Sequence, residues 1–191
     1  MQYNISYNQL IGELKHEKYE KTTDTQSYLN EKTFSMYSFF KKNEFENLLI
    51  KKGDFSKKLW LDYANWEENN GNIENCRGIW KRFSSKYVDS SEVWLKFIAM
   101  ELRNNGVINA KNIFEKALLY LPTSDKLWSK YIALESINQN NLKIRNLYKR
   151  WLSFSNNPDT WLQYLNYEKK FGSYRKVMMI FDLLVKKFKN K

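Results

Sequence analysis

Four tryptophans recur at a nearly fixed interval, and this repeat constrains the fold more than any other feature of the chain. Trp60, Trp94, Trp128 and Trp161 are separated by 34, 34 and 33 residues. A period of this length is typical of helical hairpins, each of which buries its apolar face only by packing on the next hairpin. The sequence therefore predicts an all-α repeat array.

Each tryptophan begins a similar phrase. An aromatic residue follows it at the third position: Tyr63, Phe97, Tyr131 and Tyr164. A glutamate follows it at the seventh position: Glu67, Glu101, Glu135 and Glu168. Offsets of three and seven return to one face of an α-helix. We therefore expect the first helix of each repeat at about 58–69, 91–104, 125–138 and 158–170.

A second aromatic residue stands twenty positions after each tryptophan: Trp80, Phe114, Tyr148 and Phe181. It predicts the second helix of each repeat, at about 73–84, 107–119, 141–153 and 173–188. Polar breaks separate the two helices, around Gly71, around Gly106, at 138–141 and around Gly172. Glycine or asparagine in such a break can adopt the left-handed conformation that ends a helix. Pro122 and Pro158 lie between repeats, where they interrupt no helix interior.

The repeats do not begin at the N-terminus, so we divide the chain into three parts. Residues 1–30 are expected to hold a short helix at 6–19 and a polar linker at 22–27. Residues 31–56 are expected to form a helix that caps the first repeat, since Phe45 precedes Trp60 at nearly the spacing of the other second-helix aromatics. Residues 57–191 are expected to form four repeats, at about 57–90, 91–124, 125–157 and 158–191.

Tetratricopeptide repeats also have a period of 34 residues, but they need a small residue four positions after the tryptophan. The residues there are Ala64, Ile98, Ile132 and Leu165, three of which are large. The pattern instead resembles the half-a-TPR (HAT) repeat. The phrases LWLDYANWEENNGNIENCRGIWKRF and VWLKFIAMELRNNGVINAKNIFEKALLYLP, with the motif ISYNQLIGE at 5–13, are similar to the opening of crooked-neck-like pre-mRNA-splicing factors.

This resemblance implies a right-handed superhelical solenoid of HAT hairpins that acts as a non-catalytic scaffold in the nucleus. It further implies membership of the Prp19-associated (NineTeen) complex of the spliceosome, with a Myb-like splicing factor and a second HAT-repeat protein as partners. Family members usually have more repeats than the four present here. Two alternatives stay open: a scaffold of another RNA-processing complex, in 3′-end formation or ribosomal RNA maturation, and a direct RNA-binding protein.

The repeat glutamates could be mistaken for catalytic carboxylates, but catalysis needs two carboxyl groups in one cleft, whereas these occur once per repeat. A basic residue stands ten positions after three of them: Arg77, Lys111 and Arg145. We hypothesise that Glu67–Arg77, Glu101–Lys111 and Glu135–Arg145 join the two helices within each repeat. Met178 occupies that position in the fourth repeat, so Glu168 is expected to find another donor.

Other candidate chemistry is sparse. His16 has no co-ligand or nucleophile beside it, and Cys76 occupies a small-residue position where burial is expected. We expect no catalytic residue, cofactor, metal site or small-molecule substrate, and no stretch is apolar for the length of a membrane span. The net charge of +11 would favour RNA or acidic proteins, but lysines that merely solvate the helices also explain it.

Overall fold

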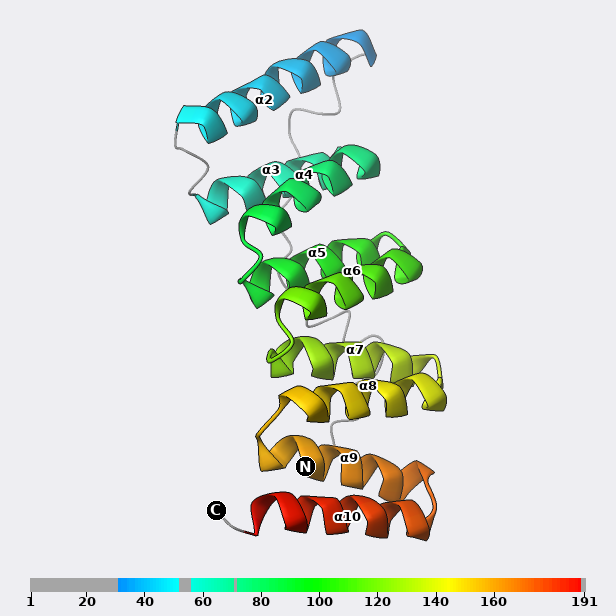
Figure 1. Cartoon of the computed structure of the whole chain (residues 1–191). Helices are drawn as coiled ribbons and strands as arrows, with labels where there is room; N and C mark the ends of the chain where they lie inside the picture. Colours follow the sequence, from blue (N-terminus) through cyan, green and yellow to red (C-terminus); the bar gives the residue numbers. More distant parts are fainter. Residues whose placement is uncertain (1–30, 52–55, 71, 190–191) are drawn as a thin grey trace. The chain divides into compact units, whose positions relative to one another are not determined.

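The computed structural model describes residues 31–51, 56–70 and 72–189, and these ranges contain nine α-helices and no strand (Figure 1). The first is α2 (Glu31–Lys51). The first helices of the repeats, called A helices below, are α3 (Lys57–Asn69), α5 (Ser91–Arg103), α7 (Asp125–Ile137) and α9 (Pro158–Phe171). The second helices, called B helices, are α4 (Ile73–Lys86), α6 (Val107–Tyr120), α8 (Asn141–Phe154) and α10 (Tyr174–Phe188).

These bounds confirm the all-α prediction and agree with the expected repeat helices to within two residues. The predicted helix at 6–19, the linker at 22–27, His16 and Gly71 lie outside the described residues. No helix among those described is both long enough and apolar enough to cross a lipid bilayer.

Polar side chains set where several helices begin. The side-chain oxygen of Ser56 accepts from the backbone N–H of Leu59 at 3.3 Å. Asn72 and Asn140 cap α4 and α8 in the same way. Each of these bonds satisfies one of the backbone donors that the first turn of a helix leaves unpaired. Pro158 is the first residue of α9, where its missing N–H removes no helical hydrogen bond.

The turns within the repeats only partly follow the prediction. Asn105 in the second repeat and Gln139 in the third adopt the left-handed conformation, with φ of 58° and 53°. Gly106 does not adopt it, and Gly172 has φ of −107°. The expectation that glycine or asparagine supplies this conformation is therefore confirmed by Asn105 and is wrong for Gly172. Gly106 and Gly172 are needed for a different reason given below.

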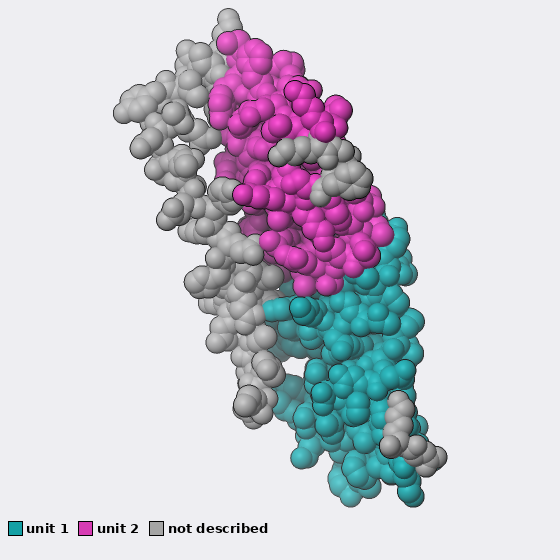
Figure 2. All heavy atoms as spheres, turned by 90° about the vertical axis from the view of Figure 1, so that its left-hand side faces the viewer, with its two compact units in different colours: residues 1–10, 111–191 teal, residues 11–110 magenta. Residues whose placement is uncertain are grey.

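The chain divides into two compact units, which Figure 2 shows in different colours. Residues 11–110 form one unit, in which α2, α3, α4 and α5 pack in chain order. The described residues from Lys111 onward form the other unit, in which α7, α8, α9 and α10 pack in chain order. The division falls inside α6.

The repeat tryptophans lie in the cores of these units. Trp60, Trp94 and Trp128 are at most 2% exposed. The indole N–H groups of Trp94 and Trp128 donate to the carbonyl oxygens of Val88 and Pro122, at 2.9 and 2.7 Å. Each indole therefore fixes the connection that precedes its own helix, in addition to filling the core.

Trp161 is the exception among the four tryptophans. It is only half-buried, and its indole nitrogen has no acceptor among the described residues. The carbonyl of Ser155, six residues earlier, instead accepts from Lys187 Nζ at 3.1 Å. The tryptophan of the fourth repeat is thus held less firmly than those of the second and third.

Candidate interaction surfaces

The repeat glutamates are all buried, at 1% exposure or less, and each accepts from a basic residue. Arg77 Nε and Arg145 Nε lie 2.7 Å from carboxylate oxygens of Glu101 and Glu168, respectively. Lys111 Nζ lies 3.0 Å from Glu135. Lys42 Nζ on α2 lies 3.1 Å from Glu67. Burying these carboxylates is tolerable because each has a cationic partner.

The predicted pairing within repeats was therefore wrong. Arg77 and Lys111 bind the glutamate of the following A helix, 24 residues later in both cases, and not the one ten residues earlier. The physical reason is the direction of the buried glutamate, which lies on the side of its helix that packs against the preceding B helix. Arg145 also donates to the carbonyl oxygen of Phe171, at the end of α9, where a cation is favourable.

Sequence reasoning missed Lys42, although its spacing carried a signal. Lys42 precedes Glu67 by 25 residues, close to the 24 residues that separate Arg77 from Glu101. With Lys42 included, all four glutamates have a basic partner. Pairing within repeats leaves Glu168 opposite Met178. The ion pairs therefore join one repeat to the next.

The two sets of repeat aromatics meet across the same junctions. Phe45 stacks on Tyr63 and Phe114 on Tyr131, each with ring centroids 4.8 Å apart. Trp80 stacks on Phe97 and Tyr148 on Tyr164, at 5.8 and 4.9 Å. These stacked rings add apolar contact between neighbouring repeats. Burial also raises the pKa of Tyr148 and of Tyr164 to about 12.

Two turn glycines make room for the buried carboxylates. A Cβ atom on Gly106 would lie 2.3 Å from Glu101 Oε2, and one on Gly172 would lie 2.1 Å from Glu168 Oε2. The backbone N–H of each glycine also donates to the carbonyl oxygen of the same glutamate, at 2.7 Å. Glycine is therefore required here by close approach and not by a left-handed backbone.

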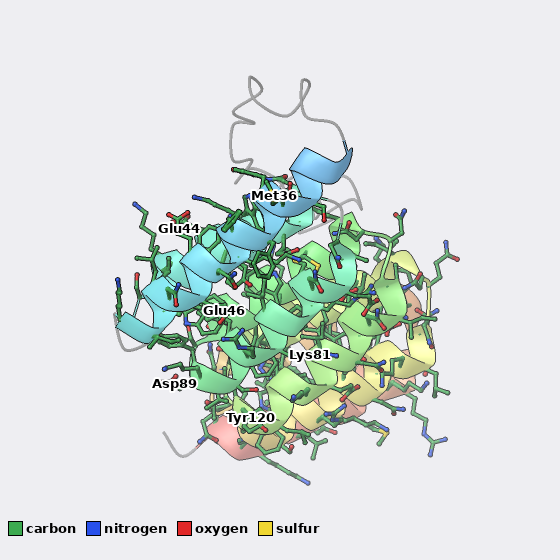
Figure 3. All side chains as sticks on the ribbon, turned by 90° about the horizontal axis from the view of Figure 1, so that it is seen from above. Met36, Glu44, Glu46, Lys81, Asp89 and Tyr120 are labelled. Atoms are coloured by element: carbon green, nitrogen blue, oxygen red, sulfur yellow. The ribbon has the colours of Figure 1, made fainter. Side chains whose placement is uncertain are left out.

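A second kind of ion pair joins a B helix to α2 or to another B helix. Glu46 on α2 accepts from both Nη atoms of Arg82 on α4, at 2.7 and 2.8 Å (Figure 3). Glu115 on α6 accepts from Lys143 and Arg150 on α8 and from the Tyr131 hydroxyl. Burial alone would raise the pKa of Glu115, but these hydrogen bonds outweigh it and lower the pKa.

The Cys76 thiol lies in surroundings that make it unreactive. Cys76 is fully buried, and its Sγ lies 3.4 Å from the carbonyl oxygen of Ala64. Burial raises the pKa of the thiol to about 12, so it is protonated at neutral pH. No group of three or more histidine, cysteine or acidic residues in the described ranges is arranged to hold a metal ion.

Large apolar side chains are exposed on helices at both ends of the described chain. Phe181 on α10 is 48% exposed, whereas its repeat equivalents Trp80 and Phe114 are 1% and 2% exposed. Leu184 and Val185 beside it are half-buried. On α2, Met36, Phe39 and Phe40 are 60–62% exposed, and Met36 is labelled in Figure 3. Such faces are typical of sites where another helix packs.

The positive charge is unevenly divided between the two units. Residues 111–191 contain sixteen lysines and arginines against six acidic residues, and residues 1–10 contain neither kind. Residues 11–110 contain sixteen lysines and arginines against fifteen acidic residues. Nearly all of the net charge of +11 therefore belongs to one unit, and such asymmetry is a sign of binding to an acidic partner.

Comparison with known families gives a match over most of the chain. Residues 51–190 match the model described as the PRP39 N-terminal HAT repeat. The match includes all four tryptophan phrases and the helices from α3 to α10. None of the curated proteins searched matches the chain significantly.

Proposed function

Since the chain belongs to the family of PRP39 N-terminal HAT repeats, we propose that it is a non-catalytic helical-repeat scaffold in pre-mRNA splicing. The observation that carries this proposal is the family match over residues 51–190. HAT-repeat proteins of splicing act by holding other proteins on their helices. The faces of α2 and α10 that expose Phe40 and Phe181 are the kind of surface that such a role requires.

The arrangement of the charged groups supports a structural role for them. Each repeat glutamate is buried and paired with a base from the preceding helix, so none faces solvent as a free carboxylate. A general acid or base must reach a substrate. The repeat glutamates are accordingly proposed to hold the repeats together and not to react.

The assembly in which the scaffold works is the finer part of the proposal. The phrases of the first three repeats resemble crooked-neck-like factors, which favours the Prp19-associated complex. The matching family model carries the name of another HAT protein, PRP39, which favours an assembly of that type. In either case the proposed location is the nucleus, where pre-mRNA splicing takes place.

Affinity purification of the tagged chain tests both the proposed role in splicing and the choice between the two assemblies. We expect splicing proteins to be enriched over an untagged control, and the presence or absence of Prp19-associated proteins then decides between the two assemblies. Enrichment of 3′-end-processing or ribosomal RNA maturation factors in their place would contradict the proposal. A Trp128→Ala variant is a matched control, because it should destabilise the repeats without changing any exposed charge.

A further inference from the structure

The excess positive charge of residues 111–191 is concentrated on B helices. Helix α8 has four basic residues and no acidic one, and α10 has four basic residues and one acidic one. The A helices α7 and α9 each have two basic and two acidic residues. The charge of this unit is therefore directed to the side on which its B helices lie.

Part of that charge is already used inside the fold. Lys143, Arg145 and Arg150 bind Glu115 or Glu168, as described above. Lys116 on α6, Lys149 on α8 and Arg175 on α10 are different. They are exposed, and none of the three forms an ion pair or hydrogen bond with any residue that the structure describes.

Each of the same three helices also exposes an aliphatic side chain. Leu119, Leu142 and Met179 are 78%, 71% and 58% exposed. Lys116 and Leu119 are three residues apart, Arg175 and Met179 four, and Leu142 and Lys149 seven, so each pair lies on one face of its helix. Leu142 and Arg175 occupy equivalent positions on α8 and α10, since they are 33 residues apart.

The three helices are held side by side by contacts between them. Lys143 and Arg150 of α8 bind Glu115 of α6, at 2.9 and 2.8 Å. Lys187 of α10 donates to the carbonyl oxygen of Ser155, directly after α8. The six exposed side chains named above lie on these linked helices and are called here the B face.

The composition of the B face distinguishes between two kinds of acidic partner. The phosphates of RNA would use the three cations, but the three aliphatic side chains add nothing to phosphate binding. A protein segment that carries both carboxylates and apolar side chains uses all six. A second copy of the same face would bring like charges together, which is unfavourable.

We propose that the B face binds an acidic amphipathic segment of a partner protein. Carboxylates of the segment pair with Lys116, Lys149 and Arg175, and its apolar residues cover Leu119, Leu142 and Met179. This inference deepens the scaffold function proposed above and rests on it. It names the chemistry of a partner and the surface that receives it.

The test uses the purified full-length chain and three labelled helical peptides of about 20 residues, a length that gives a helix of useful stability. The first peptide has glutamates and leucines on one face. The second replaces the glutamates with glutamine, and the third replaces the leucines with serine. A labelled uridine oligomer serves as the RNA probe. Binding is measured by fluorescence anisotropy at physiological salt.

We expect the first peptide to bind, and the second and third to bind at least about tenfold more weakly. The protein variant K116E/K149E/R175E should lose about tenfold in affinity, and L119S/L142S/M179S should lose a similar amount. The matched control K58E/K126E/K169E reverses the same number of charges on A helices and should bind normally.

Three results would overturn the proposal. The first peptide does not bind, or the control variant loses as much affinity for it as K116E/K149E/R175E does, or the RNA binds more tightly than the first peptide with an affinity that L119S/L142S/M179S leaves unchanged. The purification described above is independent of these measurements. Splicing proteins could co-purify although no peptide binds, in which case the B face alone is refuted. If the peptide binds but the purification enriches no splicing proteins, only the proposed role in splicing is refuted.

Discussion

The units formed by residues 11–110 and by residues 111–191 share one internal design and differ on their surfaces. Each contains one junction closed by a lysine–glutamate pair, Lys42–Glu67 or Lys111–Glu135, and one closed by an arginine–glutamate pair. In each unit, two aromatic pairs stack across these junctions. Their acidic residues number fifteen and six for the same sixteen basic residues.

This difference distinguishes the residues that every repeat junction requires from the surface residues that can vary between the units. The buried carboxylates are present in both units, because each junction requires a carboxylate for the base of the preceding helix. Residues 111–191 have few acidic residues beyond these glutamates, and Lys116, Lys149 and Arg175 form no ion pair with any residue that the structure describes. Stability should therefore respond alike in the two units to changes in the junctions, and differently to changes in salt and pH.

The largest effect is expected from the core tryptophans. Trp94→Ala and Trp128→Ala should each lower the free energy of unfolding by about 3–5 kcal/mol, because both indoles are fully buried and hydrogen-bonded. Trp161→Ala should cost clearly less, since Trp161 is half-buried. Urea unfolding followed by circular dichroism measures all three. Equal costs for Trp161 and Trp128 would contradict the weaker hold on Trp161 described above.

Breaking an ion pair should have the next largest effect, of similar size in both units. Arg77→Met and Arg145→Met each leave a buried glutamate without its cation, at a cost of about 2–3 kcal/mol in the free energy of unfolding. Lys41→Met is the control, because the Lys41–Glu44 pair is on the surface and should contribute less than about 0.5 kcal/mol. The same urea titration measures all three variants.

Alkaline pH should destabilise residues 111–191 through Tyr148. The pKa of Tyr148 is about 12 in the folded chain and about 10 in an unfolded one, so its stabilising effect is complete below pH 10 and is lost as pH rises toward 12. The loss at pH 12 is about 2 kcal/mol. The equivalent residue in the other unit is Trp80, which does not ionise. Tyr148→Phe should remove this part of the alkaline loss, as followed by tyrosinate absorbance and circular dichroism.

The turn glycines should matter in both units, with an effect of comparable size. Gly172→Ala should cost about 2–3 kcal/mol, since the new Cβ would lie 2.7 Å from the Glu168 carbonyl oxygen and nearer still to its carboxylate. Gly106→Ala should cost about 1–2 kcal/mol. Gly78→Ala, with no atom within 4 Å of the new Cβ, should instead stabilise α4 by up to about 1 kcal/mol. Thermal unfolding ranks the three variants.

Salt should give the smallest and most selective effect. Raising the salt concentration screens the repulsion among the surface cations of residues 111–191, with a gain of a few tenths of a kcal/mol. Residues 11–110 are nearly neutral and should not gain. Hydrogen exchange of amides in α8 and in α4, at low and at high salt, measures the two units separately. Equal slowing in both helices would show that the charge asymmetry has no energetic consequence.

Sequence reasoning located the helices well because the repeat gave four independent copies of each signal. The tryptophan-led phrases placed α3, α5, α7 and α9 to within one residue. It did not find the ion pair between Glu115 and Arg150, or the one between Glu46 and Arg82, because these two occur at alternate junctions and not at every one. The exposed residues of the B face could not be found either, since a leucine on a helix does not reveal which side faces solvent.

The sequence by itself determined that the chain is an array of helical hairpins, because apolar residues at helical spacing must pack and four phrases repeat the same spacing. It did not determine which base binds which glutamate. In a repeat of about 34 residues, a base ten positions after one glutamate is also about 24 positions before the next, so Arg77, Lys111 and Arg145 fit both pairings. Only the tertiary structure decided between them, because the side of the A helix on which a carboxylate is buried depends on how successive hairpins pack.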